Sequence, residues 1–107
     1  MNNNLDTQIW KKRLSENSNA ICLDVRTLNE YNESRIPNSV NIDIYDPTIF
    51  MKKINDLDRT KSYFIYCKSG KRSQMACEIM HQYGFNKLFN LDGGIEDWIN
   101  KGNETTK

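Results

Sequence analysis

The sequence predicts an α/β protein in which helices cover both faces of a mainly parallel sheet. A chain of 107 residues is long enough for one domain and too short for two ordinary ones. Short apolar runs that suit buried strands alternate with segments of helical pattern, and this alternation implies right-handed crossovers between parallel strands. We expect one domain over residues 1–107, with its core at about 5–102 and a disordered tail at 103–107.

Four segments have the composition of strands: "AICLDV" at 20–25, "VNI" at 40–42, "SYFIY" at 62–66 and "KLFNL" at 87–91. The first and third carry apolar side chains at consecutive positions between polar flanks, which is typical of strands buried on both faces. Four strands is therefore the minimum number. The Asn-rich start at residues 2–4 gives no structural signal.

Two helices are predicted in the first half of the chain. The segment at 6–14 begins at Asp6 or Thr7, either of which suits an N-cap. The segment at 46–57 begins with an Asp-Pro pair, in which the aspartate caps the helix and the proline occupies its first turn.

Two more helices are predicted in the second half. The segment at 73–83 has apolar residues at helical spacing and is followed by Gly84, which suits a left-handed helix stop. The segment "IEDWINK" at 95–101 follows a turn with paired glycines, and Gly102 ends it.

Composition excludes several classes of function. The formal net charge is +1 with 27% charged residues, so no overall field attracts the chain to nucleic acid or to an anionic membrane. No apolar run is long enough for a signal sequence or a membrane span, and we expect a cytoplasmic protein. The three cysteines, Cys22, Cys67 and Cys77, form no CxxC pair and fit neither a disulfide scaffold nor a zinc site. We expect free thiols and no metal ion.

The segment "YFIYCKSGKRSQMACEIM", residues 63–80, places Cys67 where a strand ends and a helix follows. Ligands of parallel sheets bind at this edge. The first N–H groups of a helix lack internal partners, and Gly70 permits backbone angles that turn such groups toward an anion. These surroundings, with Lys68, Lys71 and Arg72 nearby, would stabilise a thiolate, the nucleophilic form of cysteine.

Cys67 also has a structural interpretation. A lone cysteine at the end of an apolar strand is commonly a small buried hydrophobe, and basic residues near a helix start are commonly solvated. The residues of the loop by themselves leave both interpretations open.

The loop "CKSGKRS" at 67–73 resembles the active-site loop of the rhodanese domain, which reads cysteine, two residues, glycine, one residue, arginine, then serine or alanine. "LDVRTLNEYNESRIPNSVNI" at 23–42 is similar to the first signature of that family, and "LDGGIEDWI" at 91–99 is similar to its closing segment. The three motifs occur in the family's order and together cover most of the chain.

The resemblance implies a single-domain rhodanese-like fold with about five strands and the activity of a thiosulfate sulfurtransferase. Cys67 would take the outer sulfur of a small anionic donor such as thiosulfate, hold it as a persulfide and pass it to cyanide, a thiol or a small redox protein. No cofactor is implied. The residues expected to bind donor and sulfur follow the cysteine in the loop: Lys68, Ser69, Gly70, Lys71, Arg72 and Ser73.

Two alternatives share this fold. Cell-cycle dual-specificity phosphatases resemble rhodaneses but place five residues between cysteine and arginine, enough to surround a phosphate, whereas Cys67 and Arg72 have four between them. Catalytically silent rhodanese-like modules bind protein partners and commonly lack the cysteine. Sulfur transfer is favoured over both, although a fold does not by itself fix a function.

Some neighbouring residues are assigned structural roles. Asp24, Arg26 and Glu30 would lie at the same sheet edge as Cys67 and could shape the active site. We favour the alternative that they are ion-pair and loop hydrogen-bond partners, with Arg72 as a candidate mate. Cys77 and Cys22 are interpreted as packed core cysteines. The only histidine, His81, falls more than two turns into its helix and is expected at the surface.

The first signature departs from the family pattern. Many members carry a Gly-His pair before the Ile-Pro of that signature and a glycine just after it, whereas Ser34, Arg35 and Asn38 stand at those places here. The departures concern the shape of that loop and leave the cysteine chemistry untouched.

Overall fold

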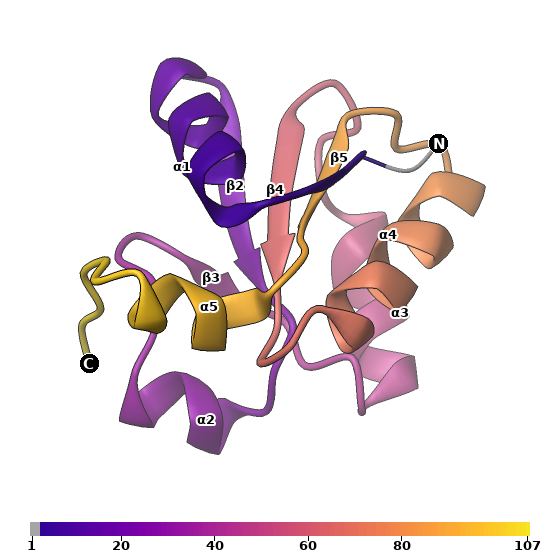
Figure 1. The fold of residues 1–107 in the computed structure, drawn as a ribbon. Helices are drawn as coiled ribbons and strands as arrows, with labels where there is room; N and C mark the ends of the chain where they lie inside the picture. Colours follow the sequence, from indigo (N-terminus) through magenta and orange to yellow (C-terminus); the bar gives the residue numbers. More distant parts are fainter. Residues whose placement is uncertain (1–2) are drawn as a thin grey trace.

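The computed structural model describes residues 3–107 and contains a five-stranded sheet with the strand order β1-β5-β4-β2-β3 (Figure 1). All neighbouring strands run parallel. The strands are β1 (Asn3–Leu5), β2 (Ala20–Asp24), β3 (Val40–Asn41), β4 (Ser62–Tyr66) and β5 (Leu88–Leu91). The four predicted strands are confirmed. The fifth, β1, forms in the Asn-rich start, where no strand was predicted.

Five helices connect and flank the strands: α1 (Thr7–Glu16), α2 (Leu28–Glu33), α3 (Pro47–Asn55), α4 (Lys71–Gln82) and α5 (Gly94–Asn100). Four of them were predicted, with ends that differ by a few residues, and Asp6 is the N-cap of α1. The short helix α2 was not predicted. It lies beyond the carboxyl ends of the strands, at the bottom of Figure 1.

The sheet separates two apolar clusters. On one face α3 and α4 contribute side chains such as Phe50 and Met80, and on the other α1 and α5 contribute Trp10 and Trp98. Strand β4 serves both, since its alternate residues belong to opposite clusters and all five are buried. The expected layers, with helices on both faces of a parallel sheet, are therefore present.

The segment at 103–107 has defined contacts, in contrast to the disorder that the sequence predicts for it. Arg35 and Thr106 form an antiparallel bridge, with N–H to carbonyl distances of 2.8 and 2.9 Å. The indole Nε1 of Trp98 also donates to the Glu104 carbonyl at 2.8 Å. These hydrogen bonds hold the segment against the loop that follows α2, and they satisfy backbone groups that would otherwise face solvent.

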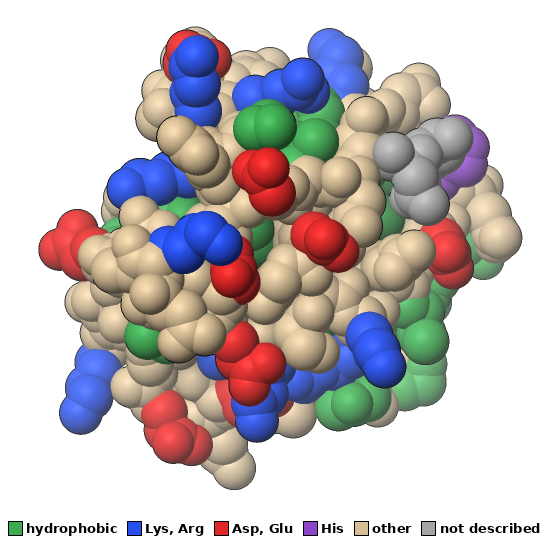
Figure 2. Space-filling model, in the orientation of Figure 1, with side chains coloured by type: hydrophobic (Ala, Val, Ile, Leu, Met, Phe, Trp, Pro, Cys, Tyr) green, Lys and Arg blue, Asp and Glu red, His purple; other side chains and the backbone are tan. Residues whose placement is uncertain are grey.

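The face drawn in Figure 2 has no large patch of a single charge sign, because Lys and Arg side chains lie among Asp and Glu side chains. This agrees with the net charge of +1. Among residues 3–107 no helix has the length and apolar character needed to cross a bilayer.

Candidate active site

Cys67 lies between the end of β4 and the start of α4, where the sequence places it. Its Sγ accepts a hydrogen bond from the backbone N–H of Gly70 at 3.1 Å. The hydroxyl of Ser73, in the first turn of α4, lies 3.3 Å from the same sulfur. Two donors from the start of one helix therefore meet at the sulfur, an arrangement that stabilises negative charge there.

Gly70 makes this arrangement possible. It is the N-cap of α4 and has φ 105°, a left-handed conformation that side chains rarely permit. A Cβ atom at this position would come within 2.3 Å of the Asp92 carbonyl oxygen. Only glycine fits here, and its backbone angles turn the N–H group back toward Cys67.

The start of α5 holds the other side of the loop. The N–H groups of Ile95 and Glu96 donate to the carbonyls of Cys67 and Lys68 at 2.9 and 3.1 Å. The paired glycines of the closing motif, predicted to form a turn, thus also bring α5 against the loop. The loop at 67–73 is therefore held by two helices, by α4 into which it leads and by the start of α5.

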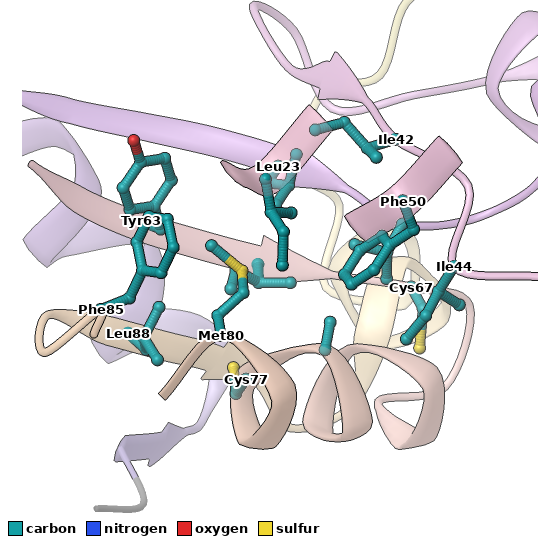
Figure 3. Close-up of a cluster of buried hydrophobic side chains, with 14 residues drawn as sticks. Leu23, Ile42, Ile44, Phe50, Tyr63, Cys67, Cys77, Met80, Phe85 and Leu88 are labelled. Atoms are coloured by element: carbon teal, nitrogen blue, oxygen red, sulfur yellow. The ribbon is translucent and has the colours of Figure 1, made fainter. Parts of the chain in front are cut away.

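Cys67 is nearly sealed from solvent, with 1% of its surface exposed. Its side chain belongs to the cluster under α3 and α4, and Figure 3 shows the sulfur beside Ile44 at one end of that cluster. The sequence led us to expect an anionic sulfur open to small donors. The hydrogen bonds to the sulfur are present, but in this conformation the exposure is not, because the loop and the apolar side chains close over it.

The structure brings two of the six predicted binding residues, Gly70 and Ser73, to the sulfur. Lys68, Ser69 and Lys71 are exposed around the loop. The Lys68 ammonium lies 4.0 Å from the carboxylate of Glu96, with both side chains more than half exposed, so this pair is weak.

Arg72 makes a two-pronged ion pair with Glu30 of α2. Its Nη1 and Nη2 donate to Oε1 and Oε2 at 2.7 and 2.9 Å, and the guanidinium lies over the ring of Tyr45. Hydrogen bonding to Arg72 lowers the pKa of Glu30 from 4.5 to about 2, and the same contact raises the pKa of Arg72. The pair ties α2 to the first turn of α4, and it is the ion pair between Glu30 and Arg72 that the sequence suggested.

Asp24 and Arg26 form a second ion pair, and it is buried. The guanidinium donates to the carboxylate at 2.7 Å and to the Ser34 carbonyl at 2.7 Å. Hydrogen bonding and charge from Asp24 outweigh burial and raise the pKa of Arg26. This pair shapes the loop after β2, as the sequence indicates, and no contact joins it to the sulfur.

The other titratable groups named from the sequence lie away from the sulfur. Cys22 and Cys77 are buried in opposite clusters. Burial, with a smaller effect of nearby Glu78, raises the pKa of Cys77 to about 12, and burial likewise raises the pKa of Cys22. His81 is exposed on α4. The three therefore occupy the positions expected of two core cysteines and a surface histidine.

The departures in the first signature leave its loop well formed. Asn38 has φ 67° and stands where many relatives carry glycine, and asparagine is among the few side chains that tolerate this conformation. Arg35 stacks on the ring of Tyr31 at 4.5 Å. The changes are compatible with the backbone that the family pattern requires.

One polar residue at the site was missed. Asn90 of β5 is buried and donates through Nδ2 to the Gly70 carbonyl at 3.2 Å. The available signal was a polar residue inside the otherwise apolar strand "KLFNL".

Comparisons with known proteins bear on what this site does. A family model described as "Rhodanese-like domain" matches residues 7–101. The chain is 28% identical over 102 residues to a "Sulfurtransferase" of Allochromatium vinosum, covering 95% of this chain and 92% of that protein. It is 31% identical over 96 residues to a "Thiosulfate:glutathione sulfurtransferase" of Saccharomyces cerevisiae, covering 80% and 69%. It spans 51% of the length of YrkF of Bacillus subtilis, with 32% identity over 97 residues.

Solved structures give the same family likeness. A rhodanese-related protein of Thermoplasma volcanium matches with a TM-score of 0.83 and 29% identity, covering 96% of each chain. A rhodanese-like domain protein of Staphylococcus aureus matches with a TM-score of 0.79 and 28% identity, covering 97% of this chain and 94% of that one.

Proposed function

The chain belongs to the rhodanese-like domain family, and from this premise we propose that it is a sulfurtransferase that carries sulfur as a persulfide on Cys67. The observation that carries the proposal is the position of the Cys67 sulfur at the start of α4, within hydrogen-bond distance of the Gly70 N–H and the Ser73 hydroxyl. Donors placed in this way favour a thiolate, and the thiolate is the form that attacks sulfur.

In the first half-reaction the thiolate of Cys67 attacks the outer sulfur of thiosulfate. A new S–S bond forms to Sγ, the S–S bond of thiosulfate breaks, and sulfite leaves with the bonding electron pair. Charge is conserved, since a thiolate and a dianion give a persulfide anion and sulfite. The Gly70 N–H and the Ser73 hydroxyl then stabilise the persulfide as they did the thiolate.

In the second half-reaction an acceptor attacks the terminal sulfur of the persulfide. Cyanide leaves as thiocyanate and a thiolate leaves as its own persulfide, and in either case the electron pair of the broken S–S bond returns to Sγ. No metal ion or organic cofactor takes part. The free thiols that this cycle requires suit a reducing compartment such as the cytoplasm.

The remaining loop residues have two proposed roles. Lys68 and Lys71 are exposed around the loop, where they attract an anionic donor and offset the charge of departing sulfite. Arg72 has a positioning role. Its guanidinium is bound by Glu30, so it holds the first turn of α4 in place and does not bind the donor itself. Since Cys67 is 1% exposed, the loop and the side chains that cover the sulfur must move before a donor reaches it.

The names of related proteins support the choice of chemistry. Sulfurtransferases of Allochromatium vinosum and Saccharomyces cerevisiae share this domain, and the second is named for thiosulfate and glutathione. Thiosulfate as donor and a small thiol as acceptor follow as the first pair to try.

A phosphatase of the same fold is less well supported. The four residues between Cys67 and Arg72 leave a short loop, and the guanidinium that would clamp a phosphate already holds Glu30 in two hydrogen bonds. Binding phosphate there would require breaking that ion pair.

The test is to incubate the purified protein with thiosulfate and to measure its intact mass before and after addition of cyanide. We expect the protein to gain one sulfur atom and cyanide to remove it. Cys67→Ser should gain none, because an alcohol cannot form the persulfide, whereas Cys77→Ala should behave as the native chain does, because Cys77 is buried in the core.

Two results would contradict the proposal. One is sulfur uptake that persists in Cys67→Ser, which would place the persulfide elsewhere. The other is no uptake by the native protein from thiosulfate or from a low-mass persulfide, together with hydrolysis of a phosphate ester, which would favour the phosphatase.

A further inference from the structure

Asn90 is a polar side chain in an apolar strand. It lies on β5 two residues after Leu88, which belongs to the cluster under α3 and α4, so it points to the same face of the sheet. Only 3% of its surface is exposed. Its Nδ2 donates to the Gly70 carbonyl at 3.2 Å and to Asn4 Oδ1 at 2.8 Å. Since the Gly70 carbonyl can only accept, the orientation of the amide is determined.

This placement has a cost. The Oδ1 atom of Asn90 is buried and finds no donor among residues 3–107. A polar atom without a partner in a protein interior is unfavourable, and a leucine of similar shape would avoid that penalty. An asparagine in such a position calls for an explanation, and of the two acceptors of its amide, Asn4 and Gly70, the second belongs to the active-site loop.

The Gly70 carbonyl is where Asn90 and Ser73 meet. It accepts from the Gln74 N–H at 3.1 Å and from Asn90 Nδ2 at 3.2 Å, and the Ser73 hydroxyl lies 3.2 Å from it. The same hydroxyl lies 3.3 Å from the Cys67 sulfur. A serine hydroxyl has one proton, so Ser73 can donate to the carbonyl or to the sulfur but not to both.

We propose that Asn90 is a positioning residue that directs the Ser73 proton to Cys67. By donating to the Gly70 carbonyl, its amide supplies that oxygen with a second donor besides Gln74. The Ser73 hydroxyl is then released to donate to the sulfur, where the bond is stronger because the acceptor is charged. Asn90 contacts neither the Cys67 sulfur nor the molecule that donates sulfur, and it acts through Ser73 alone.

The consequence reaches both half-reactions. The hydroxyl that stabilises the thiolate before attack also stabilises the persulfide after it, so loss of Asn90 weakens both. This last statement rests on the proposed function. The effect of Asn90 on the Cys67 thiolate is independent of the proposed function, because it can be measured without sulfur transfer.

The experiment compares Asn90→Leu, Ser73→Ala and the double variant. The rate at which iodoacetamide alkylates Cys67 is followed against pH, with peptide mapping to identify the modified cysteine, and sulfur uptake from thiosulfate is measured beside it. Either single variant should move the pH midpoint of alkylation upward by about one unit, equivalent to about tenfold, which is what loss of a hydrogen bond to a charged group brings.

The double variant decides the mechanism. If Asn90 acts through Ser73, adding Asn90→Leu to Ser73→Ala should change the pH midpoint no further. Asn17 offers a matched control, since its amide donates to Ser62 Oγ at 3.1 Å at the opposite end of β4, and Asn17→Leu should leave the midpoint unchanged. The melting temperature of Asn90→Leu should equal or exceed that of the native protein.

Two outcomes would overturn the inference. An unchanged midpoint in Asn90→Leu would show that the amide has no influence on the sulfur, and equal shifts in the native and Ser73→Ala backgrounds would show that it does not act through Ser73. Asn90→Ala repeats the comparison should the leucine fail to fold. If the native protein takes up no sulfur while the alkylation pattern holds, the proposed function fails and the role of Asn90 stands.

Discussion

Glycine residues at the active-site loop show how much of the site is decided by single positions. Gly94 begins α5 with φ 64°, and a Cβ atom there would lie 2.2 Å from the Lys68 carbonyl oxygen. The close approach allows the N–H groups of Ile95 and Glu96 to reach the loop carbonyls. A side chain at Gly94 would therefore separate α5 from the loop that carries Cys67.

Gly94→Ala is expected to lower the free energy of unfolding by about 3 kcal/mol or more, because backbone strain and a backbone clash act together. Gly102→Ala is the matched control. Gly102 has φ 80°, but within residues 3–107 no atom outside its chain neighbours lies within 4 Å of its Cβ position, so only strain of about 1–2 kcal/mol applies. Urea unfolding of both variants measures the difference. Equal losses would show that the packing of α5 against the loop contributes nothing.

At the scale of elements, α2 is joined to α4 by one ion pair. None of the residues of α2 is buried, and a capping box between Thr27 and Glu30 begins the helix. Glu30 also holds Arg72, so a single carboxylate serves both the start of α2 and the first turn of α4. Apolar packing contributes little to α2, and its position should depend on the charge of Glu30.

Glu30→Gln should therefore lower stability in a pH-dependent way. The pKa of Glu30 is lowered from 4.5 to about 2 in the folded protein, chiefly by Arg72. A lowered pKa adds stability above the unfolded value, and this stability disappears as the pH falls toward the folded value. We expect a loss of about 1–2 kcal/mol above pH 5, appropriate to a partly exposed two-pronged pair, that shrinks between pH 4.5 and 2.

Urea unfolding across that pH range measures the effect, and Glu33→Gln, an exposed position on the same helix, is the control. A difference between the native chain and Glu30→Gln that stays constant down to pH 2 would show that the ion pair contributes nothing and that only the capping bonds count.

The elements differ in how well the sequence reveals them. Strands β2 and β4 are apolar at consecutive positions and could be read directly. Strand β1 is three residues long and has its place because β5 pairs with it, a long-range cause that its composition does not show. For α2 the apolar period is missing, although the Thr27 to Glu30 spacing of a capping box was a usable signal. The place of Cys67 followed from strand and helix ends, whereas the contact of Asn90 depends on tertiary packing.

Over the whole molecule, the sheet places the cysteines on opposite faces. Cys22 lies in the cluster under α1 and α5, whereas Cys67 and Cys77 share the cluster under α3 and α4, with Cys67 at the end of that cluster where β4 meets its loop. All three are buried. Exposing Cys22 and Cys77 together requires both faces of the sheet to open, whereas exposing Cys67 requires only its loop and the side chains that cover the sulfur to move. The cysteines thus report on opening events of different size.

Alkylation in rising concentrations of urea should separate these events. Cys67 is expected to react with a rate that depends weakly on urea, because little surface is exposed when a loop moves. Burial raises the pKa of Cys77 to about 12 and also raises that of Cys22, so both stay protonated and unreactive until the fold opens. Their rates should rise together, with the steep urea dependence of global unfolding.

Peptide mapping after short pulses of iodoacetamide measures each rate, and circular dichroism gives the global slope for comparison. A shallow dependence for Cys77 that matches that of Cys67 would instead mean that α4 leaves the sheet as a unit, and the active-site loop would then be opened by its helix.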